Sequence, residues 1–165
     1  MNITFIGGSD GPTNIFLGGN LGFGWLNLSG LIVVVIMLIP NIIFAIKNKD
    51  YENKCKVKVM NVLEQISRYA CMLLMIFNIG IGKKGFSSVE AFLAYFFGTI
   101  ALLLAYIIIW IFYFKKKTNV KAMLLAFIPF AIFCLSGCTM RHMLLMLVAP
   151  LFGCSHMFVI SQNFE

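Results

Sequence analysis

The chain has 165 residues, of which 61% are hydrophobic and only 12% are charged, whereas soluble domains carry about a quarter charged residues. This composition excludes a soluble globular domain and is typical of a polytopic membrane protein with one domain. The formal charge of +7 does not predict nucleic-acid binding, because no aromatic residues alternate with the basic ones to form a binding surface.

The first distinctive stretch in chain order is a glycine-rich segment, residues 1–25. Gly7-Gly8 free the backbone to bend, and Gly11-Pro12 favour a turn or the start of a short helix. A broken backbone with a carboxylate, hydroxyls and an amide supplies the oxygen atoms that bind Na⁺ in discontinuous helices of transporters. The candidate cation site comprises Ser9, Asp10, Gly11, Pro12, Thr13 and Asn14. The alternative, favoured by the physics alone, is that Asp10 closes an Asx turn or caps the short helix.

The first hydrophobic run, residues 26–46, is long enough to cross a hydrocarbon core of ~30 Å at ~1.5 Å per residue. Trp25 stands at its outer end and Lys47 at its inner end, as interfacial anchors do. Pro40 lies inside the run, and polar Asn41 follows it directly.

An amphipathic segment follows, in which Glu64 precedes Arg68 by four residues and forms a favourable helical pair. We expect this segment, 57–68, to be a cytoplasmic turn or two of helix that leads into the second span, residues 69–82. That span contains Asn78.

Three further spans are predicted at residues 89–114, 122–139 and 143–160. Ser87 and Glu90 have the spacing of a capping box at the start of the third span. The sequence therefore predicts an all-α integral membrane protein, a single transmembrane helical domain over 26–165 with about five spans. Small residues that let helices approach one another are Gly30, Gly98, Ala101, Ala105, Ser136 and Gly137.

The basic residues predict the orientation of this bundle. Ten of the thirteen Lys and Arg residues lie in the first and third connections between spans, at Lys47, Lys49, Lys54, Lys56, Lys58, Arg68, Lys115, Lys116, Lys117 and Lys121. Cytoplasmic loops carry such an excess of basic residues. We therefore expect the N-terminus outside, the C-terminus in the cytoplasm, and a multi-pass protein of the cytoplasmic membrane.

The intramembrane polar candidates are Asn41, Asn78 and His156. Asn41 and Asn78 are expected to form hydrogen bonds between helices. His156 is a functional candidate, because ionisable groups at membrane depth are rare and costly, although it can also reach the interface as a neutral, hydrogen-bonded side chain. The cysteines, including Cys134, Cys138 and Cys154, are expected to pack as small apolar residues, because their depths differ too much for one metal ion.

One short string resembles a known family. The residues Ile6-Gly7-Gly8-Ser9-Asp10-Gly11-Pro12-Thr13, with Ile15-Phe16, are similar to the Gly-Gly-x-Asp-Gly-Pro-Thr motif of the membrane β subunit of sodium-ion-translocating carboxylate decarboxylases. In that family the motif lies in an interrupted membrane segment, and its Asp takes part in sodium binding and carboxyl-linked transport. The resemblance implies this role for Asp10, with Gly11, Pro12 and Thr13 shaping the site. It ends at Gly19, and the second broken segment of that family has no counterpart here, which excludes a complete decarboxylase pump.

Three functions follow as hypotheses. The favoured one is a small accessory or scaffold subunit that acts through a protein partner or a homo-oligomer, because no series of buried charges accompanies Asp10. The alternative is a cation-binding, cation-coupled transport component that uses Asp10, with Na⁺ as its possible cofactor. A membrane-embedded enzyme is least favoured, because only Cys154 and His156 offer a nucleophile and a base, and two residues apart they lie on different helix faces. No catalytic residue is predicted.

Overall fold

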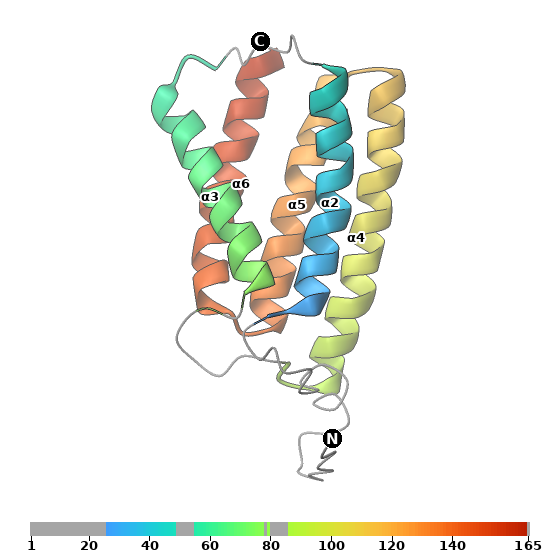
Figure 1. Ribbon diagram of the computed structural model, residues 1–165, viewed down its shortest axis with the longest axis vertical. Helices are drawn as coiled ribbons and strands as arrows, with labels where there is room; N and C mark the ends of the chain where they lie inside the picture. The colour runs from blue at the N-terminus through green and yellow to red at the C-terminus, as the bar shows by residue number, and fades with distance from the viewer. Residues whose placement is uncertain (1–25, 49–54, 78, 80–85, 165) are drawn as a thin grey trace.

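A computed structural model describes residues 26–48, 55–77, 79 and 86–164 (Figure 1). Its helices, in chain order, are α2 (Leu28–Lys47), α3 (Lys58–Ile76), α4 (Val89–Lys115), α5 (Asn119–Thr139) and α6 (Met143–Phe164). These 5 helices are each long and apolar enough to cross a membrane. The described part of the chain contains no β-strand beyond one isolated bridge between Leu26 and Phe77. The prediction of an all-helical bundle with about five potential spans is confirmed.

Successive helices run in opposite directions, and α5 is the central and most buried of them. It packs against α6 on one side and α4 on the other, while α2 closes onto α3 and α4. Helix α3 leans across the bundle and packs mainly on α6 (Figure 1). The side chains with the least exposure include Tyr106, Phe133, Met37 and Met75, and they belong to one core cluster to which all of α2 to α6 contribute.

The antiparallel order brings the lysines of the described residues to one end of the bundle. The last turns of α2 and α4 and the first turns of α3 and α5 lie at the end where α6 finishes, the upper end in Figure 1. This end, called here the lysine-rich end, carries Lys47, Lys56, Lys58, Lys115, Lys116, Lys117 and Lys121. The ammonium group of Lys47 lies 5.4 Å from the ring centre of Phe114, so the charge is held at the edge of the apolar region.

Four of the predicted spans agree with α2, α4, α5 and α6 to within about one helical turn, and the second does not. We expected 69–82, whereas α3 covers Lys58–Ile76. The amphipathic segment is itself the first half of this helix. It ends early because Phe77 is extended, with φ −105° and ψ 133°, and the Ile76 carbonyl accepts a hydrogen bond of 2.7 Å from the backbone N–H of Asn27.

Two local predictions are also corrected. The N-cap of α4 is Ser88, whose Oγ accepts from the Ala91 N–H at 3.2 Å, and not Ser87 of the predicted capping box. Ala101, predicted at a contact between helices, is exposed on α4. The remaining predicted small residues do lie at contacts, with Ser136 fully buried and the three glycines facing Met75, Leu135 and Met146.

Gly30 marks the closest approach of two helices. A Cβ atom at this position would overlap the carbonyl oxygen of Met75, which is a backbone atom of α3 and cannot turn aside. We expect Gly30→Ala to lower the free energy of unfolding by about 1–3 kcal/mol, as overpacking does elsewhere. Gly98→Ala is the matched control, because its Cβ would meet only the mobile end of Leu135, at 2.8 Å. Thermal unfolding in detergent would contradict the expectation if the two variants lost equal stability.

Candidate functional site

A charged cluster joins α3 to α6 in the half of the bundle next to the lysine-rich end. Glu64 of α3 is 5% exposed and is the buried member of the cluster. Its Oε1 atom forms an ion pair with Nη2 of Arg68, one turn further along α3. The same oxygen lies 2.9 Å from Nδ1 of His156 on α6. One carboxylate oxygen is therefore shared by a guanidinium and an imidazole.

The helical repeat explains this placement. Glu64, Ser67, Cys71 and Met75 are the buried residues of α3, and they recur at helical spacing along its whole length. At ~1.5 Å per residue, Glu64 lies about 9 Å from the start of α3. On the same scale Arg68 lies about 15 Å along α3, and His156 about 12 Å before the end of α6. All three therefore lie at similar depth within helices that are long enough to span a membrane.

Hydrogen-bond chemistry fixes the roles of the three groups. An ionised carboxylate only accepts, so Nδ1 of His156 carries the hydrogen that points to Glu64; this tautomer is assigned from the contact. Arg68 only donates, so its approach of 3.4 Å to the same Nδ1 brings two donors together and is not itself a hydrogen bond. Glu64 holds both groups in place. The imidazole also stacks on Phe152, with ring centres 5.0 Å apart at 17°.

A cavity of about 120 Å³ opens beside the cluster. Residues of α2, α3, α4, α5 and α6 line it, and its polar members are Asn41, Arg68, Tyr69, Tyr106 and His156. Its apolar lining consists of Met37, Leu38, Met72, Leu125, Pro129, Phe133 and Phe152. The cavity therefore combines a permanent positive charge and a titratable ring with hydroxyl and amide groups and a large apolar wall.

Asn41 forms the hydrogen bond between helices that its sequence position predicts. Its Nδ2 donates to Oη of Tyr106 on α4 at 2.8 Å and to the Met37 carbonyl at 2.8 Å. Since Tyr106 is 1% exposed, this bond fixes a buried phenol at the wall of the cavity. The prediction for Asn41 is confirmed.

The other predicted site residues have different outcomes. His156 is part of the cluster, with its side chain 14% exposed. Asn78 and the whole candidate cation site, Ser9 to Asn14, lie outside the described residues, so the proposed Na⁺ ligation by Asp10 stays a prediction. Glu64 and Arg68 were predicted as a helical pair but missed as site residues. The helical spacing of Glu64, Ser67, Cys71 and Met75 could have identified them, because this buried face of α3 continues past residue 68, where the amphipathic segment was expected to end.

The cysteines behave mainly as small apolar residues. Cys71 is fully buried in the core, Cys134 packs against that core, and Cys138 and Cys154 are exposed. Within the described ranges, no group of three His, Cys, Asp or Glu side chains could hold a metal ion.

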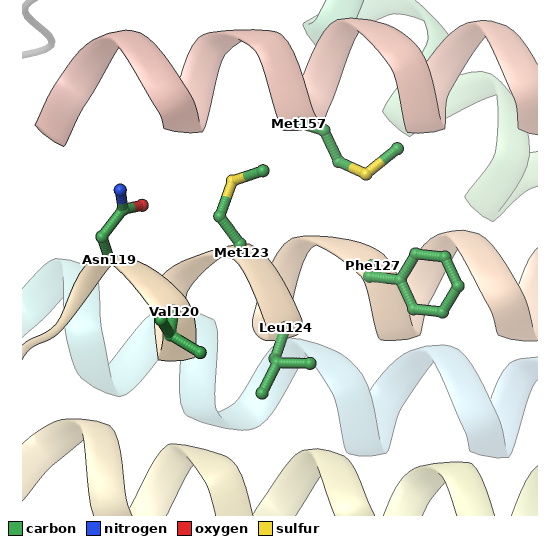
Figure 2. Close-up of a pocket in the computed structure, with 6 residues that line it drawn as sticks. All are labelled: Asn119, Val120, Met123, Leu124, Phe127 and Met157. Atoms are coloured by element: carbon green, nitrogen blue, oxygen red, sulfur yellow. The ribbon is translucent and has the colours of Figure 1, made fainter. Parts of the chain in front are cut away.

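A larger hollow lies between α5 and α6 near the lysine-rich end, with a volume of about 390 Å³. Figure 2 shows Met123 of α5 directed toward α6 and Met157 of α6 directed toward α5. The lining is Asn119, Val120, Met123, Leu124, Phe127 and Met157. With one amide and no charge, this groove offers apolar contact but no groups for acid–base chemistry or ion binding.

Comparisons with protein families, with curated proteins and with solved structures found no match to this chain. The likeness of residues 6–16 to the decarboxylase β-subunit motif therefore remains a prediction from the sequence.

The stability of the cluster can be measured directly. We expect Glu64→Gln to lower the free energy of unfolding by about 1–3 kcal/mol, because it leaves Arg68 and His156 facing each other without a carboxylate. The loss is smaller than for a fully buried pair, since the Arg68 side chain is 37% exposed. His156→Gln and the double variant complete a cycle, in which denaturant unfolding should show a coupling of about 1 kcal/mol. If the stability losses of the two single variants simply add in the double variant, the contact between Glu64 and His156 does not contribute to stability.

Proposed function

We propose that this is a multi-pass protein of the cytoplasmic membrane, with its N-terminus outside and its C-terminus in the cytoplasm. The placement of the lysines supports this orientation, because those that the structure describes gather at the end where α6 finishes, and basic residues favour the cytoplasmic side. The charged cluster then lies in the cytoplasmic half of the bundle.

We further propose that the protein is a proton-coupled membrane transport component. The observation that carries this proposal is the sharing of the buried Glu64 carboxylate by Arg68 and His156 at the wall of a cavity. Ionisable side chains at membrane depth are costly, and carboxylate and histidine groups there commonly form proton relays. Glu64 and His156 are the pair that exchanges the proton, and Arg68 supplies a fixed charge.

The charge balance of the cluster couples proton binding at Glu64 and His156 to the binding of an anion in the cavity. With Glu64 ionised and His156 neutral, the cluster has no net charge, because Arg68 stays protonated. One added proton makes the cluster positive. A net charge in a medium of low dielectric constant is unfavourable, so the proton either leaves again or is balanced by an anion in the cavity. Proton binding and cavity occupancy are thereby linked.

This proposal differs from the accessory or scaffold function that the sequence favoured. That hypothesis rested on the lack of a buried charge series beyond Asp10, and α3 now places Glu64 and Arg68 inside a potential span. A scaffold function becomes the conclusion only if the cluster proves inert. A sodium-coupled function through Asp10 is a separate proposal, tested by comparing unfolding in sodium and choline salts for the wild type and Asp10→Asn.

The orientation predicts the behaviour of reporter fusions. Green fluorescent protein fused after Glu165 is expected to fluoresce, and alkaline phosphatase at the same place is expected to be inactive, because each reporter works on only one side of the membrane. Fusions at Arg141, in the turn between α5 and α6, should show the reverse pattern. Active phosphatase after Glu165 would reverse the assigned orientation.

The function predicts a charge movement that depends on Glu64. Purified protein in proteoliposomes on a solid-supported electrode should give a transient current after a pH jump, as protons reach the cluster. Glu64→Gln should reduce that current at least about tenfold, because the carboxylate that positions the imidazole hydrogen is gone. Glu90→Gln is the matched control, since Glu90 is exposed in the first turn of α4 at the opposite end.

Either of two results would contradict the proposal. The wild type could give no current above empty liposomes, or Glu64→Gln could give the same current as the wild type. Either result alone would favour a scaffold protein that acts through partners.

A further inference from the structure

Arg68 lines the cavity and carries hydrogen-bond donors that its contacts to Glu64 and His156 do not use. A guanidinium carries five N–H donors in a planar fork. Among the described residues, only its Nη2 atom contacts Glu64 and His156. The side chain is 37% exposed and forms part of the cavity wall. The remaining donors can meet the two oxygens of a carboxylate, an anion that the planar fork binds through two parallel hydrogen bonds.

We propose that the cavity binds a small aliphatic monocarboxylate together with a proton. This inference rests on the proposed proton-coupled function and adds the class of solute. Arg68 would hold the carboxylate, while Leu125, Phe133 and Met72 in the same wall would cover the alkyl group. Tyr106 and Asn41 are already bonded to each other and present fixed polar atoms next to it.

The size of the cavity limits the solute. Its volume of about 120 Å³ is well below the roughly 300–1,000 Å³ of pockets that hold drug-sized ligands. A solute with a short alkyl chain, such as acetate or propionate, matches this volume. The seven apolar members of the wall favour an alkyl group over a second polar group.

The charge of the cluster selects an anion and links it to a proton. A cation entering the cavity would be repelled by Arg68. The Glu64 carboxylate could not offset this repulsion well, because Arg68 and His156 already share it. A monocarboxylate bound to the neutral cluster would leave one negative charge inside the bundle. One proton on the His156–Glu64 pair removes that charge, so anion and proton stabilise each other. A dianion would need a second proton acceptor, and within the described ranges no other acidic or histidine side chain lies at this cavity.

The experiment uses the full chain in lipid nanodiscs, with propionate as the probe and chloride at matched ionic strength as the reference. Propionate should raise the unfolding temperature, because it binds only the folded form. If one proton binds together with propionate, the apparent Kd for propionate should rise with pH. Above the pH at which the His156–Glu64 pair loses that proton, the rise should reach about tenfold for each unit of pH. Proton uptake on binding, followed with an indicator dye in weak buffer, gives the coupling independently.

Variants separate a binding role for Arg68 from a structural one. Arg68→Lys keeps the positive charge but loses the planar fork, and we expect at least about tenfold weaker propionate binding. Arg141→Lys is the matched control, because Arg141 is exposed at the opposite end of the bundle, and its binding should equal that of the wild type. If Arg68→Lys fails to fold, Tyr106→Phe tests the same cavity by removing one hydroxyl, and it should also weaken binding.

A series of chain lengths identifies the source of the carboxylate. Short acids dissolved in water are expected to bind best at two to four carbons, whereas fatty acids from the bilayer would bind more tightly as the chain grows. A steady gain up to octanoate would overturn the small-solute inference. So would propionate binding that does not depend on pH, or binding that Arg68→Lys leaves unchanged.

The two proposals can fail separately. A current after a pH jump that requires Glu64, without any propionate-specific stabilisation, would overturn the solute and leave the proton-coupled function in place. Propionate binding without that current and without proton uptake would instead overturn the coupling.

Discussion

The need to compensate one buried carboxylate determines how α3 lies in this structure. Glu64 is 5% exposed, and a lone carboxylate in such a place would cost several kcal/mol. Arg68 on the same helix and His156 on α6 supply the compensation through a single oxygen. Because the compensation comes from two helices, the electrostatic requirement of Glu64 also holds α3 against α6. The packing of α3 and the chemistry of the cavity therefore depend on the same contact.

The opposite end of α3 is held by backbone geometry instead. Gly30 lets α2 approach the Met75 carbonyl directly, and Asn27 adds a side-chain bond of 3.1 Å to that carbonyl. A 2.7 Å backbone bond from Asn27 to Ile76 completes the junction. Helix α3 is thus joined to α2 by close packing at one end and to α6 by charge near the other. Of these two junctions, only the second is built on ionisable side chains.

The sequence alone predicted most of the fold but only part of the site. Long uncharged runs locate α2, α4, α5 and α6 because length and hydropathy decide such spans. Helix α3 was misplaced because Glu64 and Arg68 lower the hydropathy of its first half, although the buried face of Ser67, Cys71 and Met75 shows that the helix is continuous. Asn41 and His156 were identified as intramembrane polar groups. Their partners could not be predicted, because a sequence pattern does not tell which helices become neighbours.

The junction between α2 and α3 has a mechanical consequence. The chain enters α2 through Leu26 and Asn27, and these residues are bridged and hydrogen-bonded to Phe77 and Ile76 at the end of α3. A force on the chain before Leu26 is therefore applied to the end of a stiff rod. From Ile76 to Glu64 that rod is about 18 Å long at ~1.5 Å per residue. A small tilt at its anchored end moves the carboxylate at the other end sideways, so the position of the chain at Leu26 is mechanically linked to the spacing of Glu64 and His156.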